Sequence, residues 1–396
     1  MNSFAALSPV AASEVGLDRQ ALERLRERLQ TDIAAGHLPG AVTLVARHGR
    51  IAWHDASGRR DPLAAEPMRL DTIFRIYSMT KPIVSVAAMM LVEQGRLQLT
   101  DPVGRYLGEF EATPVGVVRD GRLEREPAAR AMTVHDLLRH TSGLTYEFTG
   151  DAPVQRLYGQ SRAGDRSRTN AEASRALAEL PLICPPGTRW EYSRSTDVLG
   201  RLVEVVADRT LGAFLAERVT GPLGMVDTRF HVPPGDHGRI AEPFATDPDT
   251  GAPVRLIDVR SPAPFESGGG GMVSTALDYA RFLQMLLDGG TLDGARLLGR
   301  KTIELMTADH LGAIPVDSPL LGPGHGFGLG FAVRTHAGLA PTPGSVGQYS
   351  WGGIGGTAFW VDPRERLIAV LLTQAPGRRD HYRDLFRNLV HAALVD

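Results

Sequence analysis

Runs of apolar residues near both ends of the chain predict a β-sheet flanked by helices. Close to the N-terminus, Leu22, Leu25 and Leu29 recur at the spacing of one helix face and predict an amphipathic helix. A two-stranded hairpin is predicted after it, and four more strands and a final helix near the C-terminus. The predicted strands cover residues 41–46, 51–54, 327–333, 348–351, 357–361 and 367–373. Little strand signal separates the two groups, so we expect one antiparallel sheet built from both termini.

The middle of the chain is dominated by helical periodicity. Its longest predicted helix runs from residue 81 to residue 94 and ends at Gly95. A later helix is predicted over 275–287, where Thr275 and Asp278 have the spacing of a capping box. Shorter helices are predicted over residues 133–139, 171–180, 197–207 and 211–219.

This distribution predicts an α/β (α+β) fold with two domains. Residues 1–76 and 266–396 are expected to form a discontinuous sheet domain, and residues 77–265 a mostly helical one. Residues 231–264 hold seven prolines and few apolar clusters, which predicts irregular surface chain.

Composition and charge narrow the functional classes. The 396 residues include 43 basic and 45 acidic side chains, and a net charge of −2 gives no bulk attraction to nucleic acid or to an anionic membrane. The single cysteine, Cys184, cannot form an internal disulfide or a cysteine-rich metal site. The first residues lack the pattern of a secretory signal, and no apolar run is long enough to span a membrane. We therefore expect a soluble cytoplasmic protein with no nucleic-acid or membrane partner.

The strongest chemical signal is the tetrapeptide Ser78-Met79-Thr80-Lys81. A serine and a lysine three residues apart lie one helical turn apart on the same face. Pro82 is tolerated only in a first turn, so the helix must begin at about Ser78, where free N–H groups favour an oxyanion. The chain holds 41 arginines and only two lysines, and a lysine supplies a titratable amine that arginine cannot.

Four further motifs, spread over nearly the whole chain, join the tetrapeptide in a resemblance to a known family. The sequence resembles the serine β-lactamase and penicillin-binding-protein superfamily, in particular its class C-like members, and within these most of all the family VIII carboxylesterases. The motifs are Ser78-Met-Thr-Lys81, Leu137-Leu-Arg-His-Thr-Ser-Gly-Leu144, Pro186-Gly-Thr-Arg-Trp-Glu-Tyr-Ser193, Gly268-Gly-Gly-Gly-Met-Val-Ser-Thr275 and Trp351-Gly-Gly353.

The resemblance implies roles for particular residues. Ser78 would be the nucleophile, and Lys81 with Tyr192 would share the acid and base duties. The backbone N–H groups of Ser78 and Ile354 would form an oxyanion hole. The triplet Trp351, Gly352 and Gly353 would line the substrate site, with the active site between the two domains.

Two positions depart from the penicillin-recognising pattern. Arg194 stands where β-lactamases usually have the asparagine of Tyr-x-Asn, and Trp351 stands where they usually have a lysine or histidine. Losing that cation removes a partner for the carboxylate of penicillins. These departures favour ester substrates over β-lactams.

Several other motifs carry no separate function. The near match to a nucleophile elbow at Gly159-Gln-Ser-Arg-Ala163 lies in a polar loop without the strand and helix that the motif needs. Gly268 to Gly271 lacks the residues of a phosphate-binding loop and is expected to allow tight packing. His140 is expected to be a hydrogen-bonded turn residue, and the histidines show no zinc spacing.

The sequence thus predicts a serine hydrolase of short-chain carboxylic esters that works through an acyl-enzyme and needs no cofactor or metal. Three alternatives stay open within the superfamily: β-lactamase activity, peptide or amide hydrolysis, and acyl transfer. A fourth is a non-catalytic binding protein that retains the fold. The natural ester, its acyl length and the oligomeric state are not predicted.

Overall fold

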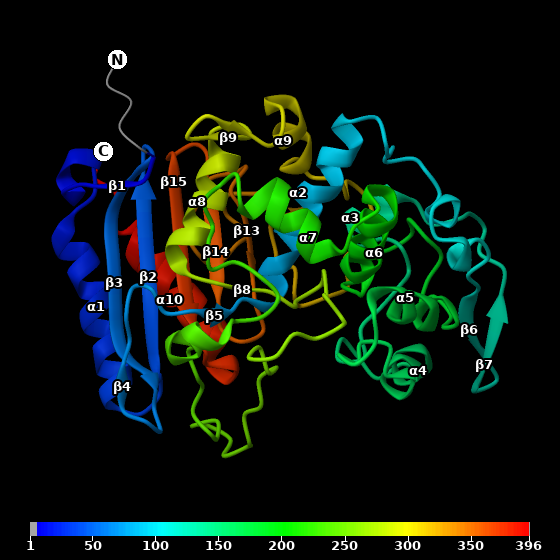
Figure 1. Ribbon diagram of the computed structural model, residues 1–396, viewed down its shortest axis with the longest axis horizontal. Helices are drawn as coiled ribbons and strands as arrows, with labels where there is room; N and C mark the ends of the chain where they lie inside the picture. The colour runs from blue at the N-terminus through cyan, green and yellow to red at the C-terminus, as the bar shows by residue number, and fades with distance from the viewer. Residues whose placement is uncertain (1–5, 396) are drawn as a thin grey trace.

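The computed structural model describes residues 6–395, and the central feature of its fold is a large mixed sheet (Figure 1). Its hydrogen-bonded order is β1-β3-β2-β15-β14-β13-β12-β11, with β4 paired to β3. The strands are β1 (Ser8–Pro9), β2 (Gly40–Arg47), β3 (Arg50–Asp61), β4 (Glu66–Pro67), β11 (His325–Phe327), β12 (Ala332–Arg334), β13 (Tyr349–Gly352), β14 (Ala358–Asp362) and β15 (Leu367–Thr373). The predicted α/β class and a sheet built from both termini are therefore confirmed.

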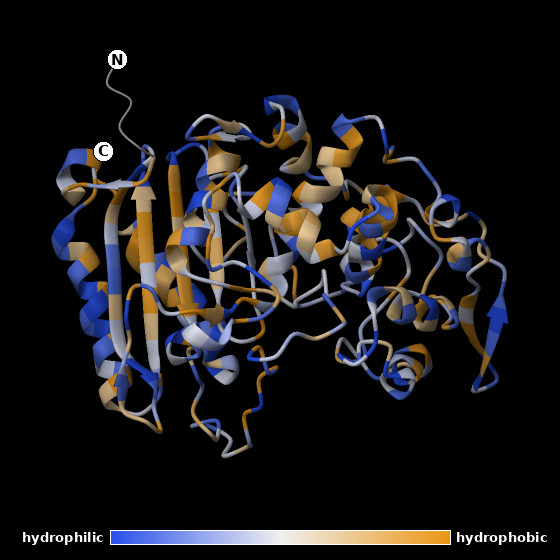
Figure 2. Cartoon of the chain, in the orientation of Figure 1, coloured by the Kyte–Doolittle hydropathy of each residue, from blue (hydrophilic) through white to orange (hydrophobic). Residues whose placement is uncertain are grey.

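Helices cover both faces of this sheet. The helices α1 (Arg19–Ala34) and α10 (Arg379–His391) pack on one face, and α8 (Ala276–Leu287) and α2 (Thr80–Glu93) lie on the other side. Along β15, Leu367 and Leu371 join the core under α1 and α10, whereas Ile368 and Val370 join the core shared with α2 and α8. Because β15 is buried on both faces, its sequence is apolar throughout, as Figure 2 shows, and does not alternate.

The rest of the chain is mostly helical and contributes three small strand pairs. Its helices are α3 (Val134–Leu138), α4 (Pro153–Ser161), α5 (Asn170–Ala178), α6 (Ser195–Ala207) and α7 (Leu211–Leu215), and α9 (Arg300–Met306) follows α8. The first two pairs are β6 (Val115–Arg119) with β7 (Arg122–Glu126), and β5 (Phe74–Arg75) with β8 (Val273–Ser274). The third pair is β9 (Thr291–Leu292) with β10 (Ala295–Arg296), and short 3-10 helices lie between the longer elements.

Four details differ from the sequence expectation. The run predicted as one strand over 327–333 is split into β11 and β12, because Gly330 adopts a left-handed φ of +101° and turns the chain. The short strand β1 runs parallel to β3, so the sheet is not wholly antiparallel. The pair β6–β7 was not predicted. The predicted helix over 211–219 is α7 followed by a π-helical turn over Ala216–Thr220.

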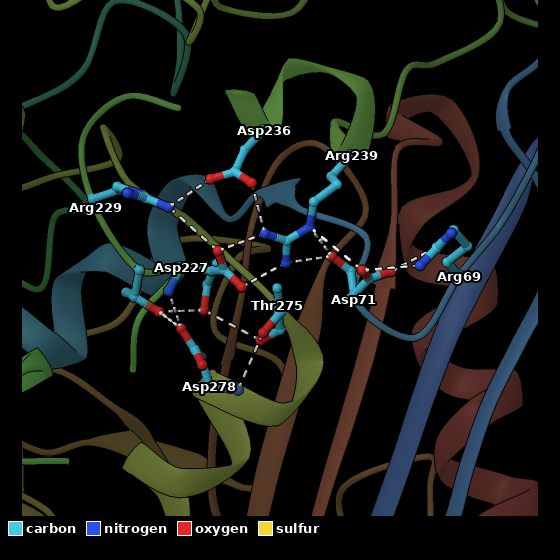
Figure 3. A network of polar contacts seen from close by, with 10 residues as sticks. Arg69, Asp71, Asp227, Arg229, Asp236, Arg239, Thr275 and Asp278 are labelled. Carbon is cyan, nitrogen blue, oxygen red and sulfur yellow. Dashed lines mark hydrogen bonds and ion pairs between the residues drawn. The ribbon is translucent and has the colours of Figure 1, made fainter. Parts of the chain in front are cut away.

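A polar network links the proline-rich segment to Asp71 and to the start of α8 (Figure 3). The guanidinium of Arg239 donates to both carboxylate oxygens of Asp227, at 2.9 and 2.6 Å, and to the carbonyl of Asp71. The Asp227 N–H donates to Asp278 at the start of α8. The capping box predicted there is half formed: Thr275 caps the Asp278 N–H, but the Asp278 carboxylate binds the neighbouring segment.

Within residues 6–395, no helix has both the length and the apolar character needed to cross a membrane. The cytoplasmic location expected from the sequence stays a prediction.

Candidate active site

The candidate nucleophile lies on a tight turn at the start of α2. Ser78 is the middle residue of a 3-10 turn, Tyr77–Met79, that leads directly into the helix. The preceding residue, Tyr77, has a left-handed φ of +45°, an uncommon conformation for an aromatic side chain. It is held there in part by its hydroxyl, which accepts a hydrogen bond of 3.0 Å from the Ile257 N–H. The turn places Ser78 on the wall of a cavity rather than in the helical stack.

The serine, the lysine and the tyrosine selected from the sequence meet at one point. The Tyr192 hydroxyl donates to Ser78 Oγ at 2.7 Å, and Lys81 Nζ donates to the same oxygen at 3.4 Å. The ammonium of Lys81 also lies 4.5 Å from the centre of the Tyr192 ring. Ser78 Oγ is thus in contact with two groups that can exchange a proton with it, although 114 residues separate Ser78 from Tyr192 in sequence.

Lys81 is buried, with only 1% of its surface exposed, and three protein groups hold its amine. Besides Ser78, it donates to the Gly269 carbonyl at 2.7 Å and to the Tyr146 hydroxyl at 3.1 Å. Burial and the nearby charge of Asp197 raise the pKa of Tyr146 well above its usual range, so this phenol is neutral. Sequence reasoning missed Tyr146, because nothing in its local pattern separates it from a core aromatic.

The glycine-rich stretch forms part of the site as well as packing tightly. Asp197 Oδ1 accepts hydrogen bonds from the Gly269 N–H at 2.9 Å and from the Ser267 hydroxyl at 2.6 Å, which helps to fix the residue whose carbonyl holds Lys81. A side chain at Gly269 would stand 2.8 Å from the Tyr146 hydroxyl and 2.9 Å from Asp197. The close approach of these groups therefore requires glycine at 269.

Aromatic rings surround Tyr192 and set its orientation. The Trp351 indole N–H donates to the Tyr192 hydroxyl at 3.3 Å, and Trp190 stacks on the tyrosine ring with 6.1 Å between centres. His140 is buried beside it, and its Nδ1 pairs with Ser193 Oγ at 3.2 Å. Burial, with the charge of Lys81, lowers the pKa of His140 well below its usual value, so the imidazole is neutral. His140 thus occupies a hydrogen-bonded turn.

The triplet Trp351-Gly352-Gly353 ends β13 and leads into a turn that rests on the residues before Ser78. A side chain at Gly353 would meet the Ile76 carbonyl at 2.4 Å, so only glycine fits there. The Ile354 N–H donates to no group of residues 6–395, and Ile354 lines the same cavity as Ser78. The Arg383 guanidinium donates to the Gly353 carbonyl at 2.6 Å and to the Thr357 carbonyl at 3.2 Å. It therefore holds both ends of this turn.

Arg194, at the atypical third position of the tyrosine motif, makes no contact with Ser78. It pairs with Glu147 at 2.8 Å and lies over the Tyr146 ring at 4.9 Å. Its second partner is Asp197, at 3.5 Å. Arg194 therefore supports the ring and the carboxylate that position Lys81, and its own charge is balanced.

A single cavity of about 830 Å³ brings these groups together. Ser78, Tyr146, Tyr192, Trp351, Gly352 and Ile354 line it, with the apolar side chains Phe148, Phe265 and Leu320. The near-match motif at Gly159-Gln-Ser-Arg-Ala163 does not contribute to it: Ser161 ends α4, and its hydroxyl donates to the Tyr158 carbonyl.

Comparison with known proteins places the chain in a family of related enzymes. The family model described as Beta-lactamase matches residues 24–393. Esterase EstB of Burkholderia gladioli is 36% identical, covering 93% of this chain and 94% of its own length. Protein Rv1367c of Mycobacterium tuberculosis is 40% identical, covering 86% of each chain. The solved structure of EstCE1, described as a hydrolase with promiscuous acyltransferase activity, has a TM-score of 0.78 and 31% identity, covering 94% of this chain and 99% of its own.

Proposed function

The chain belongs to the beta-lactamase family and is a serine hydrolase, and we propose that it is a carboxylesterase that cleaves short-chain esters through an acyl-enzyme on Ser78. The observation that carries the proposal is the contact of Ser78 Oγ with both Tyr192 and Lys81 at the wall of a cavity. We assign residues 1–76 and 266–396 to one domain and residues 77–265 to the other, with this site between them.

In the proposed reaction, Ser78 Oγ attacks the ester carbonyl and gives its proton to the Tyr192–Lys81 pair. The C–O bond to the alcohol then breaks, and the departing alkoxide takes the proton back from that pair. A water molecule then gives a proton to Tyr192 of this pair and attacks the acyl carbon. The bond between that carbon and Ser78 Oγ breaks, Oγ takes the proton back from the pair, and the carboxylic acid leaves. Lys81, held by the Gly269 carbonyl and Tyr146, keeps its amine within reach of both hydroxyls.

We assign the tetrahedral oxyanion to the N–H groups of Ser78 and Ile354. The free Ile354 N–H and the contact of its turn with the residues before Ser78 support this assignment. Backbone donors fixed before the substrate binds need no reorganisation as charge develops. Trp351, Gly352 and Gly353 would form the wall along which the substrate lies.

An ester is favoured over a β-lactam by the groups that flank Ser78. Trp351 offers an indole already hydrogen-bonded to Tyr192, and it provides no cation for a penicillin carboxylate. Arg194 is engaged with Glu147 and Asp197 and offers no side-chain amide to a peptide substrate. The name of the relative EstB, an esterase, points the same way.

The decisive experiment is hydrolysis of p-nitrophenyl butyrate by Ser78→Ala, with Ser161→Ala as the matched control. Ser161 lies in the near-match motif outside the cavity, so its replacement should leave turnover unchanged. Loss of turnover in Ser78→Ala alone, with a fluorophosphonate adduct mapped to Ser78 in the wild type, is the expected result. A folded protein that stays unlabelled at Ser78 and does not hydrolyse the ester would favour a non-catalytic binding role.

Acyl transfer is a second candidate, favoured by the likeness to EstCE1, whose description names that activity. The same acyl-enzyme would be intercepted by an alcohol in place of water. Adding methanol to the butyrate assay and measuring methyl butyrate against butyric acid separates the two outcomes. Nitrocefin turnover, measured alongside, tests the lactam alternative.

A further inference from the structure

The catalytic cavity extends beyond Ser78 along one side of α10. Three arginines of this helix, Arg379, Arg383 and Arg387, recur every four residues and all line the cavity. Residues spaced in this way lie on one helix face. The lining here also includes Asp380 and Asp384 of the same helix, and Pro341 and Thr342 of the chain before β13. We call this part of the cavity the α10 arm.

The three arginines differ in how far their charge is balanced. Arg383 donates to the turn after β13 and pairs with Asp380 at 3.1 Å. Arg379 contacts the same carboxylate at 3.5 Å. Arg387, in contrast, has no carboxylate within ion-pairing distance in the described part of the chain. Its side-chain contacts are a single hydrogen bond of 3.4 Å to Thr342 Oγ1 and the face of Trp360, 5.4 Å away.

The surroundings make this guanidinium a poorly compensated charge. Burial lowers the pKa of Arg387 to about 10, and repulsion from Arg334 and Arg383 acts in the same direction, against the attraction of Asp384. Arg387 is still charged at neutral pH. The Trp360 indole beside it has a buried N–H, Nε1, without an acceptor among residues 6–395. Asp380 is paired with Arg379 and Arg383, and Asp384 attracts Arg387 without forming an ion pair with it. The arm therefore offers the unused N–H groups of Arg387, a guanidinium that has no salt bridge among the described residues.

We propose that the α10 arm binds a carboxylate carried by the ester substrate, with Arg387 as its ionic partner. The inference rests on the proposed ester hydrolysis at Ser78 and specifies its substrate class: an ester whose acyl or alcohol portion ends in a carboxylate. A guanidinium presents paired N–H groups that match the two carboxylate oxygens, and Arg387 uses only one of its five donors toward residues 6–395. The Trp360 ring provides an apolar wall beside this contact.

The test measures a preference, so that it does not depend on the absolute rate. Mono-p-nitrophenyl esters of dicarboxylic acids with five to ten carbons are compared with p-nitrophenyl esters of monocarboxylic acids of equal length. A second series carries the carboxylate on the alcohol portion, as butyrate esters of ω-hydroxy acids, and locates the anion in one portion or the other. The quantity compared is the ratio of kcat/KM for the anionic ester to that for the neutral one.

In the wild type we expect this ratio to exceed one at some chain length in one series. It should fall by about tenfold or more in Arg387→Met, mainly through KM, as expected for loss of a charge-assisted hydrogen bond. Arg387→Lys keeps the charge and should retain part of the preference. Arg24→Met, which changes an exposed arginine of α1 outside the cavity, should leave the ratio unchanged.

Two results would overturn the assignment. One is an equal ratio in the wild type and Arg387→Met at every chain length. The other is a preference that survives in Arg387→Met but disappears in Arg166→Met, because Arg166 also lines the cavity without an ion pair in the described chain. If no ester is hydrolysed, calorimetric titration of the wild type with suberate still tests whether the α10 arm binds a carboxylate. Suberate binding weakened in Arg387→Met supports the arm even though ester hydrolysis fails, and absence of binding rejects it.

Discussion

Arg383 offers a test of whether the turn after β13 is catalytic. Its guanidinium bridges the carbonyls of Gly353 and Thr357, at 2.6 and 3.2 Å, and so encloses the peptide that carries the Ile354 N–H. A hydrogen bond from a charged donor contributes about 1.5–3 kcal/mol. In Arg383→Met, both bonds are lost. The turn keeps its own hydrogen bonds, from Gly353 N–H to the Thr357 carbonyl and from Gly356 N–H to the Gly353 carbonyl, and is loosened rather than unfolded.

The expected effect follows from this partial loss. Removing an oxyanion donor outright costs about 100- to 1,000-fold in kcat, so a loosened donor should cost about 10- to 100-fold. The assay is steady-state hydrolysis of p-nitrophenyl butyrate, with the loss expected in kcat and little change in KM. Arg24→Met is the matched control, because this exposed arginine of α1 lies outside the cavity. A folded Arg383→Met enzyme whose kcat stays within twofold of the wild type would refute the role of the turn.

Three further predictions address the proton-transfer groups and the pH dependence of stability. Tyr192→Phe, which removes the 2.7 Å hydrogen bond to the nucleophile, should lower kcat for p-nitrophenyl butyrate by about 100- to 10,000-fold, and retention of more than a tenth of the activity would contradict the assigned role. Lys81→Met should lower kcat over a similar range, whereas Lys301→Met, at an exposed lysine paired with Glu304, should leave kcat unchanged. Equal activity of the two variants would exclude Lys81 from the proton transfer. Burial raises the pKa of Asp278 to about 6, so the folded state holds the carboxyl proton more tightly than the unfolded chain does. The stability that this protonated carboxyl contributes is therefore lost as pH rises from about 4 through 6. In Asp278→Asn, about 3 kcal/mol of this loss should be absent, measured as the difference in the free energy of urea unfolding between pH 4 and pH 7. Parallel pH profiles of the wild type and the variant would contradict this prediction.

The sheet could be predicted from sequence because its strands carry local signals. β15 is a continuous apolar run, and β2 and β3 are joined by a short turn at His48-Gly49. The pair β6–β7 escaped prediction because half of its residues are exposed and only Val115 is buried, so burial imposes no alternating pattern on it. The break between β11 and β12 was missed for a different reason: Gly330 lies inside an apolar run, and only its left-handed backbone reveals the turn.

The candidate site was predictable only where residue type and spacing carry the chemistry. Ser78 and Lys81 are one turn apart, so their contact follows from helix geometry. Tyr192 was located through family resemblance and not through any local rule. Tyr146 and Arg383 escaped prediction because their roles arise from packing between segments far apart in sequence, and each resembles an ordinary aromatic or surface arginine in its own segment.

The use of lysine at position 81 is explained by what an arginine there would do. In a chain with 41 arginines, a fixed positive charge is supplied by guanidinium almost everywhere, and these groups form the structural networks around Asp227 and Asp136. Residue 81 is enclosed by the Gly269 carbonyl and two phenols within hydrogen-bond or ring contact. A planar guanidinium would need a wider space and could not release a proton at neutral pH. In the proposed mechanism, an amine in this enclosure both donates to a carbonyl and passes a proton toward Ser78, and this role accounts for a lysine at position 81.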